Sequence, residues 1–179
     1  NAKGLAFTEF FNQKGVLHQF SSVQRPEQNS VVKRKHQHLL NVARALFFQS
    51  NIPTTYWSEC ILCATFLINR TPSHALDNLS PFHKLYEYPP DYSLFRSFGC
   101  LAFASTLLSH RDKFTARARC CIFIGYPIGM KAYKMMDVET KEIFISRDVV
   151  FHEHIFPFKH SIYNHQPDPF HSMVIPCLQ

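Results

Sequence analysis

The feature that most constrains the fold of this chain is a change of apolar periodicity at the Pro89-Pro90-Asp91-Tyr92 turn signal. Before this turn, apolar residues recur every three or four positions, as they do along one face of a helix. After it, from Leu94 onward, they form short runs separated by turn residues, a pattern typical of the strands of a small barrel. The sequence therefore predicts an α+β chain in which helices come first and a small β-barrel follows.

Two long helices are expected before the turn. The first begins at Asn29 or Ser30, since either side chain can cap a helix. The second follows a break at residues 50–53, where Thr54 or Thr55 can serve as the cap. Their apolar stripes comprise Val32, Leu39, Val42, Ala43 and Leu46 in the first helix, and Trp57, Cys60, Ile61, Ala64, Leu67 and Ile68 in the second.

Shorter elements are expected on either side of these helices. A helix within residues 1–13 should stop at Gly15, and Ser80-Pro81 should cap and start a short helix that ends at Tyr86. Residues 16–20 are a lone strand candidate. The barrel strands are expected at residues 98–105, 119–125, 131–136 and 142–151.

The cysteines indicate core packing rather than a metal site. Cys60 and Cys63 have Cys-x-x-Cys spacing, but no second Cys or His pair stands at zinc-finger spacing, and both lie on the apolar stripe of a helix. His36 and His38 are two positions apart on a helix, so they point to different faces and are not expected to share a metal. We therefore expect no metal ligands and reduced, buried thiols.

The first long helix has an unusual charge pattern at its start. A helix N-terminus carries partial positive charge and favours Asp or Glu there, yet this helix opens with cations. Such an end attracts an anion, and phosphate is the obvious candidate. The basic residues of this helix are Lys33, Arg34, Lys35, His36, His38 and Arg44.

The segment Pro26-Glu-Gln-Asn-Ser-Val-Val-Lys-Arg-Lys-His36 resembles a motif of copia-type retrotransposon integrases, Pro-x-Gln-Asn-(Gly/Ser)-Val-Val-Glu-Arg-Lys. In that family the Glu is the third carboxylate of an Asp-Asp-Glu set that holds divalent metal ions, Mg²⁺ in the ancestral enzyme, for DNA strand transfer. The position of that Glu is occupied here by Lys33. The second catalytic Asp of the family lies just before the residue that matches Asn1, so the chain is expected to lack it. The resemblance thus implies an inactive integrase with no cofactor.

The resemblance extends along most of the chain. Trp57, residues 69–72, Ser80-Pro81 and Pro89-Pro90 match the family pattern of the integrase core. In the second half, the matching segments resemble the SH3-like domain that follows that core: residues 98–100, 125–126, 131–133 and 146–149. The implied organisation is a truncated, mainly helical, ribonuclease-H-like core in residues 1–90, an SH3-like barrel in residues 91–156, and a linker or tail in residues 157–179.

The expected function is residual, nonspecific binding of DNA through its phosphates. A net charge of +6 favours a polyanionic partner. The candidate residues fall into one cluster on the first long helix and one in the barrel: Gln28, Asn29, Lys33, Arg34, Lys35 and Arg44, then Arg111, Lys113, Arg117 and Arg119. Three alternatives stay open at this point: solvated faces that bind nothing, a protein-interaction module formed by the barrel, and a non-functional transposon relic.

The remaining expectations concern surfaces and location. Glu9 and Glu59 are interpreted as exposed helix residues, and Glu59 interrupts the most apolar helix, so no membrane span is expected. With no secretory leader, an intracellular location, nuclear or cytoplasmic, is expected. The lone strand at residues 16–20 cannot cover two helices, so exposed helix faces are expected to drive self-association, and the barrel is expected to be the more stable half.

Overall fold

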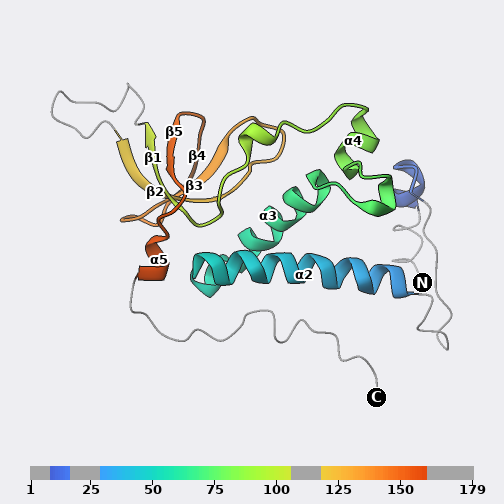
Figure 1. The fold of residues 1–179 in the computed structure, drawn as a ribbon, viewed down its shortest axis with the longest axis horizontal. Coiled ribbons are helices and arrows are strands. Elements are labelled where there is room, and N and C mark those ends of the chain that lie inside the picture. Colours follow the sequence, from blue (N-terminus) through green and yellow to red (C-terminus); the bar gives the residue numbers. More distant parts are fainter. Residues whose placement is uncertain (1–8, 17–28, 106–117, 161–179) are drawn as a thin grey trace, which may run out of the picture. The chain divides into compact units, whose positions relative to one another are not determined.

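The computed structural model describes residues 9–16, 29–105 and 118–160 (Figure 1). The chain divides into two compact units, residues 1–37 and 38–179. Most of the predicted strand at residues 16–20 and most of the predicted tail lie outside the described residues. No helix in the described part of the chain is long and apolar enough to cross a lipid bilayer.

In the first unit, residues 9–13 are helical and the turn ends at Gly15, whose φ is 65°. The N–H of Lys14 donates to the carbonyl of Phe10 (3.2 Å), and that of Val16 donates to the carbonyl of Phe11 (2.9 Å). These bonds satisfy carbonyls that would otherwise be left unpaired at the helix end. The predicted stop at Gly15 is therefore confirmed.

The long helix α2 (Ser30–Ser50) crosses from the first unit into the second. It begins at Ser30, one of the two predicted starts. Its residues up to His38 are exposed, including Val32 of the predicted apolar stripe, which is 68% exposed. From Leu40 onward the stripe is buried, at Leu40, Ala43, Leu46, Phe47 and Ser50.

The other helical elements lie in the second unit. They are η2 (Thr54–Tyr56), α3 (Trp57–Arg70), η3 (His74–Leu76), α4 (Pro81–Tyr86), η4 (Tyr92–Leu94) and α5 (Pro157–His160). The Ser80 hydroxyl caps α4 by accepting from the N–H of His83 (3.1 Å), as predicted. The predicted Thr cap of the second long helix is wrong, because the 3₁₀ turn η2 leads directly into α3 and no side chain caps either element. Trp57, assigned to the buried stripe, is 36% exposed.

Five antiparallel strands follow: β1 (Leu101–Ser105), β2 (Ala118–Gly125), β3 (Tyr133–Asp137), β4 (Ile143–Ser146) and β5 (Val149–His152). Their order in the sheet is β4-β3-β2-β1-β5, so the last two strands in the sequence occupy opposite edges. The run predicted as one strand at residues 142–151 is therefore two. It divides because the chain leaves β3 after Ser146 and pairs with β1 from Val149.

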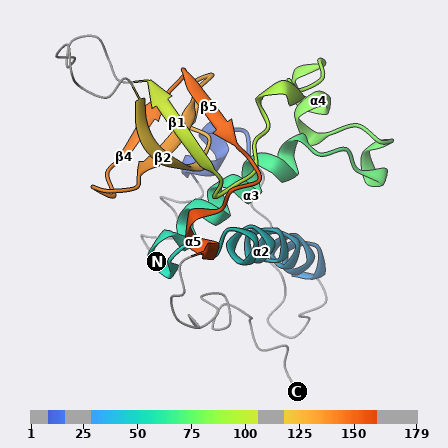
Figure 2. The same cartoon turned by 60° about the vertical axis from the view of Figure 1, so that its left-hand side comes forward.

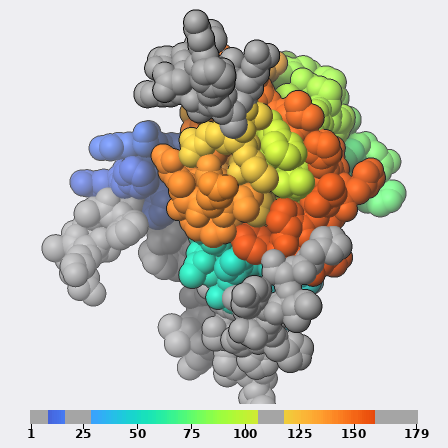
Figure 3. Space-filling model, turned by 90° about the vertical axis from the view of Figure 1, so that its left-hand side faces the viewer, coloured from blue at the N-terminus to red at the C-terminus, as the bar shows by residue number. Residues whose placement is uncertain are grey.

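The short link between β4 and β5 requires the sheet to roll up. Three Cα steps span at most ~11 Å. The edges of a flat five-stranded sheet would be ~19 Å apart, given the usual strand spacing. The sheet must therefore curl until its edges approach, as Figures 1 and 2 show. Along β4 and β5, exposed residues alternate with partly buried ones, and their outer surface is seen in Figure 3.

The helices do not lack a cover, contrary to the expectation from the lone N-terminal strand. Strand β2 is buried on both faces from Cys121 to Gly125. On the inner face, Cys121 and Phe123 pack with Ala102, Tyr133 and Met135 inside the barrel. On the outer face, the buried residues of α2 and α3 share one core with the sheet, namely Leu40, Ala43, Leu46, Phe47, Ile52, Cys60, Cys63, Ala64, Phe98, Ile122, Ile124 and Met136.

This shared core changes two expectations. The predicted boundary at residues 90 and 91 is not a break in the hydrophobic core, so the barrel is not packed independently of the helices. The apolar stripes on which self-association was expected to depend are largely covered within the second unit. The reason is that a strand with apolar residues on both faces can pack on both sides, as in sheets covered by helices.

The end of α2 meets the start of the barrel at Ser50 and Gly99. Ser50 is fully buried, and its hydroxyl donates to the carbonyl of Leu46 (2.7 Å) and accepts from the N–H of Ile52 (3.4 Å). Gly99 has a φ of 80°, and a Cβ there would overlap the Cβ of Ser50 and lie 3.1 Å from its Cα. Only glycine permits this approach, which also lets Gly99 N–H donate to the carbonyl of Phe123 (2.8 Å).

Replacing Gly99 with alanine should destabilise the second unit by at least ~3 kcal/mol, because the new methyl group clashes with Ser50 and φ is unfavourable. Gly129→Ala is a matched control, since its φ is 73° but nothing lies within 4 Å of the added Cβ. It should cost only ~1 kcal/mol. Urea unfolding followed by circular dichroism measures both values, and equal losses in the two variants would contradict the proposed clash.

Candidate nucleic-acid interface

The basic start of α2 is exposed among the described residues. Lys33, Arg34 and Lys35 are exposed, and the first turn of α2 contains no acidic residue. The Nε of Arg34 donates to the carbonyl of Ser30 (3.3 Å) within the same helix. Consecutive helical residues are separated by about 100°, so the three side chains point in different directions around the helix. They form a collar of positive charge rather than a single basic face.

The other predicted residues are placed less favourably. Asn29 is exposed at the start of the helical segment, whereas Arg44 lies in the second unit and is partly buried. Gln28, Arg111, Lys113 and Arg117 lie outside the described residues. Of the predicted cations that the structure describes, it therefore brings together those at the start of α2.

Arg119 has carboxylate partners within the sheet. Its Nε and Nη2 each lie 3.0 Å from Asp137 Oδ2, and Nη2 also lies 3.0 Å from Glu142 Oε2. Its guanidinium carbon is 4.6 Å from the centroid of the Phe144 ring. The hydrogen bond to Glu142 is the largest cause of a raised pKa for Arg119. Its positive charge is thus balanced by two carboxylates, and the function proposed below does not depend on it.

Asp137 also organises the turn that joins β3 and β4. Its Oδ1 accepts from the N–H groups of Glu139 and Thr140 (2.9 Å each). The bond from Thr140 is the largest contribution to the lowered pKa of Asp137, and Arg119 adds to it. Sequence reasoning missed this arrangement because only the register of β2 against β3, in which Cys121 pairs with Asp137, brings residue 119 close to the turn.

Glu59 is not an exposed helix residue, which corrects the prediction. Its carboxylate binds Lys134 Nζ at 2.7 and 2.8 Å, and the Glu59 side chain is only 12% exposed. This ion pair joins α3 to β3, so the single acid in the first turn of α3 is used to hold the helix on the sheet. Glu9, in contrast, is exposed as predicted.

Four of the five described cysteines are core residues, as predicted, whereas Cys120 is not. Cys60, Cys63, Cys100 and Cys121 are buried free thiols, and only Cys120 is exposed among the five that the structure describes. Burial raises the pKa of Cys60 and Cys63 to about 12. In the described segments, no three His, Cys, Asp or Glu side chains are grouped in a way that could hold a metal ion.

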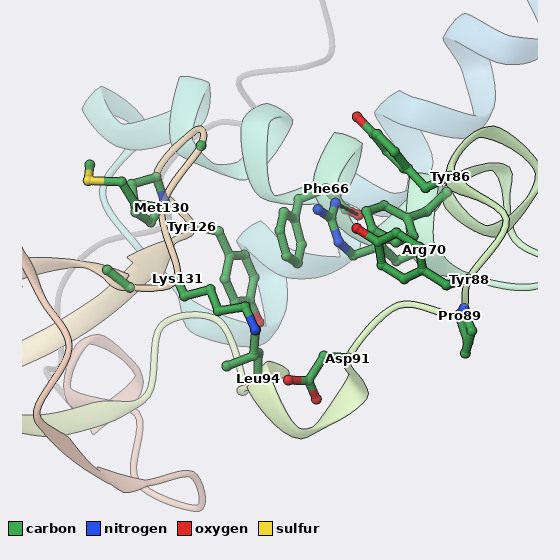
Figure 4. Close-up of a pocket in the computed structure, with 14 residues that line it drawn as sticks. Phe66, Arg70, Tyr86, Tyr88, Pro89, Asp91, Leu94, Tyr126, Met130 and Lys131 are labelled. Atoms are coloured by element: carbon green, nitrogen blue, oxygen red, sulfur yellow. Dashed lines mark hydrogen bonds between the residues drawn. The ribbon is translucent and has the colours of Figure 1, made fainter.

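A pocket that sequence reasoning did not find lies between α3, α4 and the loop after β2 (Figure 4). Its volume is about 590 Å³. Five aromatic side chains line it together with the guanidinium of Arg70: Phe66, Phe82, Tyr86, Tyr88 and Tyr126. The only signal in the sequence was the density of aromatic residues around residues 82–95.

Native thiols should react with iodoacetamide in the order of their exposure. In a Cys177→Ser background, Cys120 should be alkylated first, since the other four described thiols are buried and have pKa values of about 11 to 12. Because only the thiolate is nucleophilic, these buried thiols should react on unfolding and not at pH 8 in the native state. Peptide mass spectrometry measures the order. Equal labelling of Cys60 and Cys120 in native protein would show that Cys60 is not in the core.

The fold and a comparison with known families define the class of the second half. Residues 100–164 match the family model of the retroviral polymerase SH3-like domain, and all five strands of the rolled sheet lie in this range. The barrel predicted from short strand-like runs is thus an SH3-like domain of that family.

The relatives of the chain are Pol polyproteins. It is 36% identical over 154 residues to the retrovirus-related Pol polyprotein from transposon RE1 of Arabidopsis thaliana, with 86% of this chain and 10% of that protein covered. The corresponding protein from transposon RE2 of the same plant is 34% identical over 150 residues, with coverages of 84% and 10%. That from transposon TNT 1-94 of Nicotiana tabacum is 32% identical over 147 residues, with coverages of 82% and 11%.

The chain is therefore related to the Pol polyproteins of retrotransposons, as its resemblance to copia-type sequences predicted. It spans about a tenth of the length of these relatives.

Proposed function

We propose that this chain is an integrase-related part of a retrotransposon Pol polyprotein that binds nucleic acid through phosphate contacts and does not catalyse strand transfer. In this proposal the helices before residue 90 derive from the C-terminal part of a ribonuclease-H-like integrase core. The observation that carries the proposal is the exposed cation collar formed by Lys33, Arg34 and Lys35 at the N-terminus of α2.

The physical argument for phosphate binding is that the helix dipole and the side-chain charges are both positive at the N-terminus of α2. The backbone of α2 places partial positive charge at its N-terminus, and the three side chains add full charges in the same place. No carboxylate within the first turn of α2 competes with a phosphate for these charges. Contacts of this kind bind the backbone of a nucleic acid and do not read its sequence.

The argument against strand transfer is the positive charge of the Lys33 side chain. Mg²⁺ requires oxygen ligands, and the resemblance places a carboxylate where this chain has an ammonium group. At ~4 Å and an effective dielectric constant near 20, each unit of metal charge is repelled by roughly 4 kcal/mol. The described residues do not fit a Mg²⁺ site, so no catalytic step is assigned to them.

Binding of the full chain to duplex DNA should weaken steeply as salt rises. Lys33→Ala combined with Lys35→Ala should lower the slope of log K against log salt by about two units, because two phosphate contacts are lost. The matched control is Lys84→Ala combined with Lys141→Ala, which removes the same charge from exposed lysines elsewhere. Fluorescence anisotropy over a salt series measures the slopes. If both double variants change the slope equally, net charge and not the α2 collar governs binding.

The same protein should show no Mg²⁺- or Mn²⁺-dependent joining of labelled DNA ends, since Lys33 repels the metal. The assay is run at a salt concentration where anisotropy has shown the DNA to be bound, so that a negative result is not due to missing substrate. Metal-dependent strand transfer by the unmodified chain would overturn the second half of the proposal and leave the binding half standing.

A further inference from the structure

All residues that line the aromatic pocket belong to the second unit, whereas Lys33, Arg34 and Lys35 belong to the first. Helix α3 contributes Phe66 and Arg70, helix α4 contributes Phe82 and Tyr86, and Tyr88 follows α4 directly. The loop after β2 adds Tyr126, which stacks on Phe66. A volume of about 590 Å³ is in the range of pockets that hold small molecules or single residues of a polymer.

Arg70 is the cation inside this pocket, and its charge is stabilised by rings rather than by an acid. Its guanidinium carbon lies 3.6 Å from the centroid of Phe66 and 4.9 Å from that of Phe82. Nη1 donates to the carbonyl of Phe66 (3.3 Å), and burial lowers the pKa of Arg70. Within the described ranges, no carboxylate forms an ion pair with Arg70. Its remaining N–H groups are suited to an anionic oxygen pair.

The rings around Arg70 divide into a packed set and an open set. Phe66 stacks on Tyr126 with centroids 3.8 Å apart and planes at 12°, so these two rings are used within the fold. The ring centroid of Phe82 lies 4.7 Å from that of Tyr86 and 5.4 Å from that of Tyr88. Tyr86 and Tyr88 are nevertheless 53% and 57% exposed. Figure 4 shows Arg70 with Phe66 on one side and Tyr86 and Tyr88 on the other. Two tyrosine rings are thus left open beside the guanidinium.

The rim carries one acid and one further cation. Asp91 Oδ1 accepts from the N–H (3.1 Å) and the hydroxyl (2.6 Å) of Ser93. The hydrogen bond from the Ser93 hydroxyl is the largest cause of the lowered pKa of Asp91, and the charge of Lys131 adds to it. The formal charges of Asp91 and Lys131 sum to zero, so the net charge of the pocket lining equals that of Arg70.

We propose that this pocket binds one unpaired nucleotide of a single-stranded nucleic acid, with the base against Tyr86 and Tyr88 and a phosphate on Arg70. A nucleotide combines a flat ring system with an anionic group. The first can stack on the rings of Tyr86 and Tyr88, and the second can bind the guanidinium of Arg70. Stacking on aromatic side chains tolerates any base, so the pocket adds preference for strand state and not for sequence. This inference deepens the proposed function, on which it rests.

The pocket and the α2 collar differ in the state of DNA that each can bind. A phosphate contact is available on both duplex and single-stranded DNA, whereas the face of a base in a duplex is covered by its neighbours. Loss of the open rings should therefore weaken single-strand binding selectively. If the pocket instead bound a peptide, loss of the rings would not weaken single-strand binding selectively.

The experiment compares the full chain with its Tyr86→Ala, Tyr88→Ala double variant, using a short oligothymidylate and a hairpin duplex of equal length. Anisotropy should show about tenfold weaker binding of the single strand and less than about twofold change for the duplex. Leu85→Ala is the matched control, because Leu85 is on the same helix and 73% exposed but does not line the pocket. It should change neither affinity. Circular dichroism verifies that each variant is folded.

The outcomes separate the two proposals. If the tyrosine variant loses both affinities equally, or neither, the pocket proposal is overturned while the salt-slope result for the α2 lysines still decides the proposed function. If the intact chain binds no nucleic acid, the proposed function fails. Thymidine 5′-monophosphate then decides on the pocket, by saturation-transfer NMR with the same variants. Displacement of that nucleotide by a proline-rich peptide of higher affinity would instead identify a protein-binding site and overturn the inference.

Discussion

The structure of the second unit depends on the close approach of α2 to the start of the barrel at Ser50 and Gly99. The missing Cβ of Gly99 lets the helix end approach the turn before β1. The hydroxyl of Ser50 donates to the carbonyl of Leu46 in its own helix, so Ser50 can be fully buried. This contact brings Phe47 and Phe98 into one apolar core. The two-sided burial of β2 then joins that core to the interior of the barrel.

The position of each charge decides its role. Lys134 and Arg119 lie on the sheet beside carboxylates, and their ion pairs fix α3 and the turn after β3. Pairs that are partly removed from water are costly to break, because the remaining charge loses its partner. Lys33, Arg34 and Lys35 lie in water on an end of a helix that has no acid. Charges that are already paired with carboxylates are not available to a polyanion, so net charge alone does not identify the cations that could bind one.

As proposed, the collar and the pocket contact different parts of a nucleic acid. Charges at an exposed helix end attract phosphates over a distance set by salt, and they do so whatever the state of the bases. An enclosed guanidinium beside open rings acts only at contact and requires a base face that is free. Because the two features belong to different units of the chain, each can be removed by substitution without altering the other.

The sequence by itself determined the local order of the chain: the change from helical to strand periodicity near residue 90, the Ser80 cap, the buried Cys-x-x-Cys pair and the reversed charge at Lys33. These follow from spacing and residue type, which act over one or two turns. Tertiary structure alone decided that residues 142–151 form strands on opposite edges, that Glu59 binds Lys134, and that Arg70 enters an aromatic pocket. Each of these depends on which face of one element meets another, and periodicity predicts that a face is apolar without specifying its partner.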